Sequence, residues 1–365
     1  MKNIVEATNN LVEIISSNQS SDKEVNKALH LCLEYLPDSN KEEIDTFMKK
    51  IFALSSLPNI DRASYATTIC GHLAEHGFPC DAIVDDVINF YDNLLDKSKP
   101  FFDLFYSKVE ELEEGDEDED DEDYDRDSEI DALYLDLLND EDFVSEELRN
   151  TVISLDKFYN CAIAVFSANK EYLYKGKERL QKKVAYIGNY SDGCYWLDKL
   201  FTVLFDEPVI VIDIDRKIGF SGKISGIVEN FQLQHLLMSL PFLNDGKSAI
   251  SEETLAVVNG TGEQRSEKII ECKWNMYNLE VTENSEWNDF IAGKSDLPTD
   301  LSDTWIWSEG APSHISVHNG YRVILLGKAS YKRTSYAQRT FNSLRASIEI
   351  EKELSSEEIN KWLKV

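Results

Sequence analysis

The sequence has no long hydrophobic run and no paired cysteines. In its 365 residues no apolar stretch approaches the length of a membrane span, and the N-terminal MKNIVEATNNLVEIISS carries acidic and polar residues where a signal peptide needs an apolar block. The six cysteines are scattered along the chain and form no CxxC pair. We therefore expect reduced thiols and a cytoplasmic protein.

Basic residues are scarce as well. The chain has 37 Lys and Arg against 68 Asp and Glu, which gives a formal net charge of −31 at pH 7. This charge repels phosphate groups, so we expect no nucleic acid and no membrane among the partners, whereas a basic protein would be attracted. A hydrophobic content of 42% with 11% aromatic residues still supports folded cores.

The first 109 residues carry the periodicity of helices. Ser21 and Glu24 match a capping box, Gly77 is a typical residue after a helix end, and Pro100 is placed to open the last of six helices. We predict an all-helical layer over residues 1–109. It resembles stacked helical hairpins, although no fixed period marks a repeat.

Residues 110–131, EELEEGDEDEDDEDYDRDSEID, form an acidic run. The run holds 16 acidic residues and one basic residue, Arg126. It therefore carries about −15 of the net charge, and like charges at this density repel one another in a compact state. We predict a disordered acidic linker here, followed by a second domain over residues 132–365.

The second domain begins with helical patterns and continues with strands. Residues 209–212 form a continuous β-branched run, as in a strand buried on both faces, and Asn230 is placed to cap a helix that Pro241 ends. Further strands are predicted at 269–272, 279–281, 304–307 and 321–326. The predicted fold class is α+β: an all-helical N-terminal layer, an acidic linker, then a mixed α/β domain with a small sheet.

Two long blocks of the second domain resemble a family of uncharacterised bacterial proteins. They are ISGIVENFQLQHLL (224–237) and WIWSEGAPSHISVHNGYRVILLG (305–327), and SYKRTSYAQRTF (330–341) is similar to a third block of that family. Gln234 stands where the family tends to have histidine, so no role of that histidine carries over. Since no activity is established for the family, the resemblance implies an architecture and candidate surfaces, and no reaction.

The same blocks hold the residue types that are enriched at binding hot spots, namely Trp, Tyr and Arg. Arginines on a loop can grip a carboxylate or phosphate with two hydrogen bonds, or they can pair with the acidic chain's own carboxylates. The candidate binding residues are Asn230, Gln232, Trp305, Trp307, Glu309, Arg322, Tyr331, Arg333 and Arg339.

A metal site is suggested by His72, Glu75 and His76, which match the H-x-x-E-H spacing of one class of zinc peptidases. The two histidines would share a helix face. However, Gly77 follows at once, so His76 would lie in a last helical turn, where a histidine favours the helix dipole. No third ligand helix is evident, and short motifs of this kind have low specificity.

Two further patterns suggest chemistry. Asp213 and Asp215 follow a buried strand, as in magnesium-binding DxD motifs, but the basic Arg216 comes next where phosphoryl transfer needs a small or hydroxyl residue. Cys194 lies in the turn SDGCYW and could pair with His235, His314 or His318 as a nucleophile, although a cysteine beside aromatic residues is usually part of a core.

The function that we predict is non-enzymatic: a cytoplasmic protein of adaptor or immunity type that binds another protein without a cofactor, and the charge favours a basic partner. The alternative is an enzyme that acts on an anionic small substrate at a pocket between the Asp213 turn, the Asn230 helix start and residues 305–339, because helix N-termini favour anions. The third hypothesis is a zinc protein that uses the HxxEH stretch. The sequence does not fix the oligomeric state.

Overall fold

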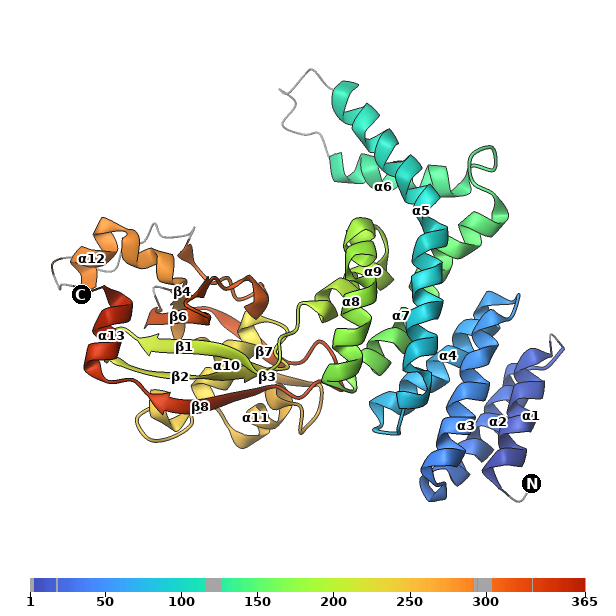
Figure 1. Cartoon of the computed structure of the whole chain (residues 1–365), viewed down its shortest axis with the longest axis horizontal. Coiled ribbons are helices and arrows are strands. Elements are labelled where there is room, and N and C mark those ends of the chain that lie inside the picture. Colours follow the sequence, from blue (N-terminus) through green and yellow to red (C-terminus); the bar gives the residue numbers. More distant parts are fainter. Residues whose placement is uncertain are drawn as a thin grey trace. The chain divides into compact units, whose positions relative to one another are not determined.

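The computed structural model describes residues 3–17, 19–115, 126–291, 294, 304–329 and 331–364. The chain divides into two compact units, Met1–Phe201 and Thr202–Val365. Helices build the first unit, and the second combines helices with two sheets (Figure 1). The predicted α+β class is confirmed. In the ranges that the structure describes, no helix has the length and apolarity needed to cross a membrane.

The first unit holds α1 (Ile4–Ser16), α2 (Asp22–Tyr35), α3 (Lys41–Phe52), α4 (Ile60–Glu75), α5 (Val84–Gly115), α6 (Arg126–Asn139), α7 (Glu146–Ser167), α8 (Lys170–Ile187) and α9 (Asp192–Phe201). The short turns η1 (Leu36–Asp38), η2 (Ala53–Ser56), η3 (Asp81–Ile83) and η4 (Gly188–Tyr190) lie between them. Local signals placed several helix ends correctly. Ser21 forms the predicted capping box with Glu24, and Gly77 takes a φ of +81° after α4.

Pro100 does not open a separate helix, because α5 continues through it. A proline inside a helix removes one main-chain hydrogen bond, which normally ends or kinks the helix. Here the next turn carries Phe101, Phe102 and Phe105, all fully buried. The rings of Phe101 and Phe105 lie 5.3 and 5.5 Å from Tyr134 of α6. This aromatic packing holds the turn after Pro100 in the helix and outweighs the local penalty.

The predicted linker and domain boundary differ from the structure. Residues 110–115 end α5 and residues 126–131 begin α6, while residues 116–125 lie outside the described residues. Residues 132–201 pack with the N-terminal helices, since α7 lies against α4 and α5. The Tyr91 hydroxyl of α5 donates to the Leu155 carbonyl of α7 at 2.7 Å. Helical patterns lie on both sides of the acidic run, so only tertiary packing shows that they form one unit.

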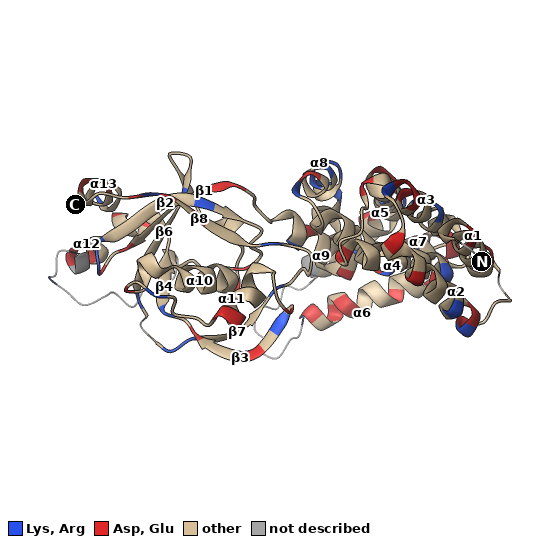
Figure 2. Cartoon of the chain, turned by 90° about the horizontal axis from the view of Figure 1, so that it is seen from below, with Lys and Arg blue, Asp and Glu red and all other residues tan. Residues whose placement is uncertain are grey.

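Charge also joins α8 to α5 in this unit. Asp92 is buried on α5 and forms ion pairs with Arg179 (2.7 Å) and Lys183 (2.6 Å) of α8. Burial raises the pKa of Asp92, but the hydrogen bonds from Lys183 and Arg179 outweigh burial and lower it overall. Figure 2 shows Lys and Arg residues along α8. The basic helix therefore neutralises a buried carboxylate of the acidic unit.

The second unit holds the strands β1 (Glu207–Asp213), β2 (Ile218–Ser225), β3 (Arg265–Glu271), β4 (Trp274–Tyr277), β5 (Val317–His318), β6 (Tyr321–Lys328), β7 (Thr334–Gln338) and β8 (Ser347–Glu353). Its helices are α10 (Asn230–Ser239), α11 (Glu252–Asn259), α12 (Ser285–Ile291) and α13 (Ser356–Leu363), with η5 (Pro241–Leu243), η6 (Leu279–Glu283) and η8 (Pro312–His314). The main sheet has the order β4-β6-β1-β2-β8, and β5 also pairs with β6. Strand β1 is parallel to β6, and β3 pairs with β7 in a separate ribbon.

Strand β1 lies at the centre of the main sheet and divides two cores. Val209 and Val211 face a core with residues of α10 and α11, whereas Ile210 and Ile212 face a core with residues of α12 and α13. All four side chains are buried. The prediction of a strand covered on both faces is therefore confirmed.

Two predicted strands are not strands. Residues 279–281 belong to the 3-10 turn η6, where the Thr282 hydroxyl donates to the Leu279 carbonyl at 2.8 Å. Residues 304–307 make a single bridge, between Trp305 and Tyr277. Residues 279–281 face a core without the partner strand that a ladder needs, whereas residues 304–307 pair with the end of β4 at one position only. By contrast, the stretch predicted at 269–272 overlaps the end of β3, and the stretch at 321–326 lies within β6.

We predict that Gly193→Ala destabilises the first unit. A Cβ atom at this position would lie 2.6 Å from the Tyr91 hydroxyl oxygen and closer still to the Leu155 carbonyl oxygen. Both groups belong to the α5–α7 contact, so α9 must move away. The free energy of unfolding should fall by roughly 1–3 kcal/mol, measured by urea denaturation with circular dichroism. An unchanged midpoint would contradict the close packing of α9 on α7.

Candidate functional site

The start of α10 is closed by the protein's own carbonyl groups. Asn230 does not cap this helix as predicted, because the N-cap is Glu229 and makes no side-chain cap bond. Instead, the main-chain N–H groups of Asn230 and Phe231 donate to the carbonyls of Gly310 and Ser308, both at 2.8 Å. A helix N-terminus attracts anions through its free N–H groups. In α10 two of these N–H groups already donate to carbonyls of the protein, so they do not attract an anion.

Helix α10 is unusual because its polar side chains are buried. Asn230, Gln232 and Gln234 are between 1% and 5% exposed. Their amide nitrogens donate to the carbonyls of Trp307 (2.8 Å), of Val258 in α11 (2.7 Å) and of Trp274 in β4 (3.1 Å), respectively. Gln232, a predicted binding residue, therefore holds α11 in place and is not available to a ligand. The Asn230 side chain fixes the position of the segment that carries Trp307.

Four predicted binding residues do come together, and we name them the aromatic–arginine patch: Trp305, Trp307, Tyr331 and Arg333. The Trp305 ring lies 5.6 Å from Trp307 and stacks on Tyr331 at 6.1 Å. The Arg333 guanidinium lies 6.0 Å from the Trp307 ring and 5.1 Å from the Tyr331 ring. Cations are attracted to ring faces at such distances.

The patch faces solvent. Trp307 is 51% exposed and Tyr331 is 46% exposed, and the neighbouring Glu309 is exposed as well. Arg333 donates to the Ser308 hydroxyl at 2.7 Å and to the Tyr331 hydroxyl. Within the described part of the chain no carboxylate pairs with Arg333, although the protein is strongly acidic. The patch therefore presents ring faces and a guanidinium that no described carboxylate pairs with.

Arg322 and Arg339 are not part of this patch. Arg322 forms an ion pair with Glu207 at 2.8 Å and donates to the Ser313 carbonyl at 2.9 Å. Arg339 is 5% exposed and donates to main-chain carbonyls, including that of Glu263 at 3.0 Å. Both guanidinium groups are used by the fold.

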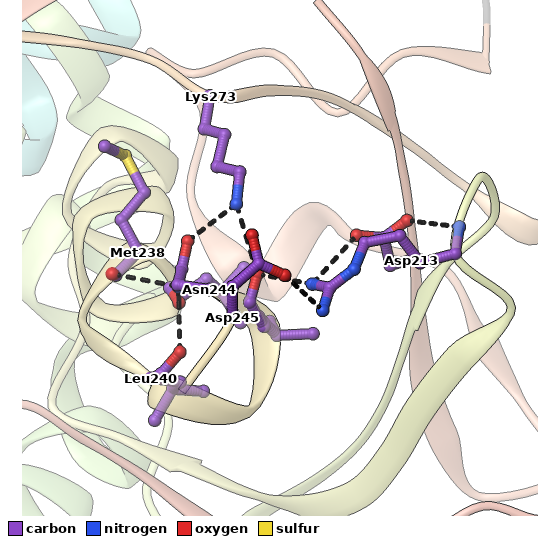
Figure 3. Close-up of polar contacts among 9 residues, drawn as sticks. Asp213, Met238, Leu240, Asn244, Asp245 and Lys273 are labelled. Carbon is purple, nitrogen blue, oxygen red and sulfur yellow. Dashed lines mark hydrogen bonds and ion pairs between the residues drawn. The ribbon is translucent and has the colours of Figure 1, made fainter. Parts of the chain in front are cut away.

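The Asp213 turn is held by a polar network, which Figure 3 shows. Asp213 is 3% exposed and accepts from the Arg216 N–H at 3.1 Å, and burial raises the pKa of its carboxyl group. Arg216 pairs with Asp245 at 2.9 Å. Lys273 donates to the Asn244 side-chain oxygen at 2.8 Å. The network ties the β1–β2 turn and the start of β4 to the loop after α10, which agrees with the interpretation of a charged turn.

His235 lies beside a serine that the sequence did not single out. Its Nε2 is 3.1 Å from the Ser335 hydroxyl of β7, and burial lowers the pKa of His235 to about 4, so the ring is neutral at pH 7. Cys272 is buried next to Ser335, and burial raises the pKa of its thiol. Cys194 is fully buried in the first unit and burial raises its pKa to about 12, so it is no nucleophile at neutral pH.

The HxxEH residues lie at the exposed end of α4. The His76 Nδ1 is 2.8 Å from the His72 carbonyl oxygen, and the two imidazole rings lie 4.1 Å apart. Glu75 is exposed. Among the described residues no group of three or more His, Cys, Asp and Glu is placed to hold a metal ion.

The comparisons with known proteins add no relative. No protein-family model, no curated protein and no solved structure matches the chain. The resemblance to uncharacterised bacterial proteins stays a prediction, and the candidate site rests on its geometry. The residues of the aromatic–arginine patch were predicted from the residue types in the resembling blocks. Ser308 and Ser335 were not predicted, because a single serine carries no pattern in the sequence.

We predict that His235 makes the second unit less stable as the pH falls. The buried His235 has a pKa of about 4 in the folded protein, against 6.5 for the ordinary side chain. Between pH 6.5 and pH 4 the imidazole is therefore protonated in the unfolded chain but neutral in the folded one, which favours unfolding. Stability is therefore present above pH 6.5 and is lost toward pH 4. From pH 7 to pH 5 the loss due to this residue should be about 2 kcal/mol.

Urea unfolding followed by tryptophan fluorescence at both pH values measures this loss. His235→Gln should show a smaller decrease than the wild type, and the difference removes the contribution of the carboxylates. Equal decreases in the two proteins would contradict a neutral buried imidazole.

Proposed function

We propose that the chain is a protein-binding protein of adaptor or immunity type, without catalytic activity, that meets its partner at the aromatic–arginine patch. The observation that carries this proposal is the exposure of Trp307 and Tyr331, whose rings both lie within 6.0 Å of the Arg333 guanidinium. Trp, Tyr and Arg dominate binding hot spots because they bury much apolar surface while keeping a polar group. Large rings held in place by neighbours also lose little entropy on binding.

The surface beyond the patch supports an extended interface. Arg333 leads directly into β7, which forms a ribbon with β3. On this ribbon Ile269 is 64% exposed and Tyr336 is 41% exposed, and the two are a cross-strand pair. The Arg265 guanidinium lies 5.0 Å from the Tyr336 ring. A second aromatic–arginine pair thus lies on the ribbon that Arg333 leads into.

Charge indicates the kind of partner. A net charge of −31 accelerates association with a basic protein by steering, and Glu309 offers an exposed carboxylate next to the rings. We therefore expect the association rate to fall steeply as salt is added. A partner whose binding does not respond to salt would contradict this part of the proposal.

Two sets of contacts weigh against the alternative of an enzyme that acts on an anionic small substrate. The N–H groups at the start of α10 are occupied by the carbonyls of Ser308 and Gly310, and Asp213 is held in its turn by Arg216. The third hypothesis, a zinc protein, loses support because His76 bonds to the main chain of its own helix.

We predict that Trp307→Ala and Tyr331→Ala each weaken partner binding by about 30-fold or more, since truncating a hot-spot residue costs at least about 2 kcal/mol. The partner is first captured from lysate of the source cells with immobilised wild-type protein, and Kd is then measured for the purified pair. Tyr195→Ala is the matched control, because Tyr195 is 40% exposed and lies in the first unit. A captured partner that binds both patch variants as tightly as the wild type would overturn the proposal.

A further inference from the structure

The first unit contains a groove of about 610 Å³ between α5, α7 and the connection from η2 to α4. This volume lies within the range of ligand sites, roughly 300–1,000 Å³. Its lining combines apolar side chains, among them Leu57, Ile60, Phe90 and Phe158, with polar ones and with the cation Lys97.

Two helices each present one face to the groove. The lining residues of α5 are 90, 93, 94 and 97, and those of α7 include 147, 150, 151, 154 and 158. These spacings of three and four residues describe a single stripe on each helix. The groove is therefore a furrow between two rigid helices, which is a suitable support for a ligand.

The floor of the groove is apolar and partly open. The Phe90 ring meets the Phe158 ring edge to face at 4.9 Å, and Phe90 is only half-buried. Leu57 and Ile60 are half-buried on the other side, and Pro58 is exposed. An aromatic or aliphatic side chain placed here would gain hydrophobic burial without any rearrangement of the helices.

The rim carries polar groups that the fold does not use. The side-chain amides of Asn93 on α5 and Asn150 on α7 form no hydrogen bond with any residue that the structure describes, and they lie on opposite walls. Glu146 and Glu147 are exposed and have no cationic partner within the described ranges. Amides can bond to both the N–H and the C=O of a peptide, and carboxylates attract Lys or Arg.

We propose that this groove binds a short peptide segment of a partner protein, in which an aromatic or aliphatic residue lies next to Lys or Arg. The apolar side chain rests on Phe90, the main chain of the segment bonds to Asn93 and Asn150, and the basic side chain reaches Glu146 and Glu147. The two carboxylates outnumber the lining cation Lys97, and the net charge of the chain likewise favours such a segment over an acidic one. This site lies in the helical unit and does not depend on the aromatic–arginine patch.

The test uses the full-length protein and a phage library of random heptapeptides, selected in 0.15 M NaCl. We expect enriched peptides that combine an apolar residue with Lys or Arg. Labelled copies are then measured by fluorescence anisotropy. Glu146→Gln with Glu147→Gln should weaken binding by about tenfold, and Thr151→Trp, which fills the groove, should abolish it. Glu141→Gln with Asp142→Gln removes two exposed acids outside the groove and is the matched control, with less than about twofold change expected.

Three results would overturn the proposal. The first is a library with no peptides enriched above the unselected pool. The second is enriched peptides that bind the Glu146/Glu147 variant and Thr151→Trp as tightly as wild type, or that lose as much affinity in the Glu141/Asp142 control. The third is a loss of affinity in Trp307→Ala alone, which would assign the peptides to the aromatic–arginine patch. Using both a charge variant and a filling variant keeps the test valid if one of them does not fold.

Discussion

The C-terminal unit depends on the burial of the polar helix α10. A buried amide without a hydrogen bond costs about 1–3 kcal/mol, so each of the amides of Asn230, Gln232 and Gln234 requires a carbonyl group. The carbonyls that accept from their N–H groups belong to the segment before β5, to α11 and to β4. The Asn230 Oδ1 and Gln234 Oε1 atoms are buried without a hydrogen-bond partner among the described residues. The helix therefore fixes three segments that are distant in the chain, and it places Trp307 with its carbonyl inward and its ring toward solvent.

This arrangement also decides which arginines remain available. Arg322 and Arg339 donate to main-chain carbonyls and stabilise the fold, whereas Arg333 donates to hydroxyl groups and lies over exposed rings. In a chain with 68 acidic residues an arginine would usually meet a carboxylate, as Arg179 does with Asp92. A guanidinium that is held between neutral groups keeps its ability to bind an outside partner, and the same holds for the unused amides of the groove in the helical unit.

Much of the fold follows from local rules, and the failures have identifiable causes. Side-chain caps and apolar spacing predicted the helices of the first 109 residues, and the β-branched run predicted the central strand β1. Pro100 failed as a boundary because three phenylalanines beyond it pack against Tyr134. The stretch 279–281 failed as a strand because burial alone does not supply a partner for a ladder. The domain boundary failed because helical patterns continue on both sides of the acidic run.

The sequence by itself determined the α+β class, the charge, the central strand and the identity of the aromatic and arginine residues, because these depend on composition and on short-range spacing. Only the tertiary structure decided which of the nine predicted binding residues meet. It joined Trp305, Trp307, Tyr331 and Arg333 in the patch. The side chains of Asn230, Gln232, Arg322 and Arg339 form hydrogen bonds within the fold instead, and Glu309 lies beside the patch. The physical reason is that a polar side chain forms hydrogen bonds with groups that lie within about 3 Å. Those groups come from distant parts of the chain, so the fold decides which of them are within reach.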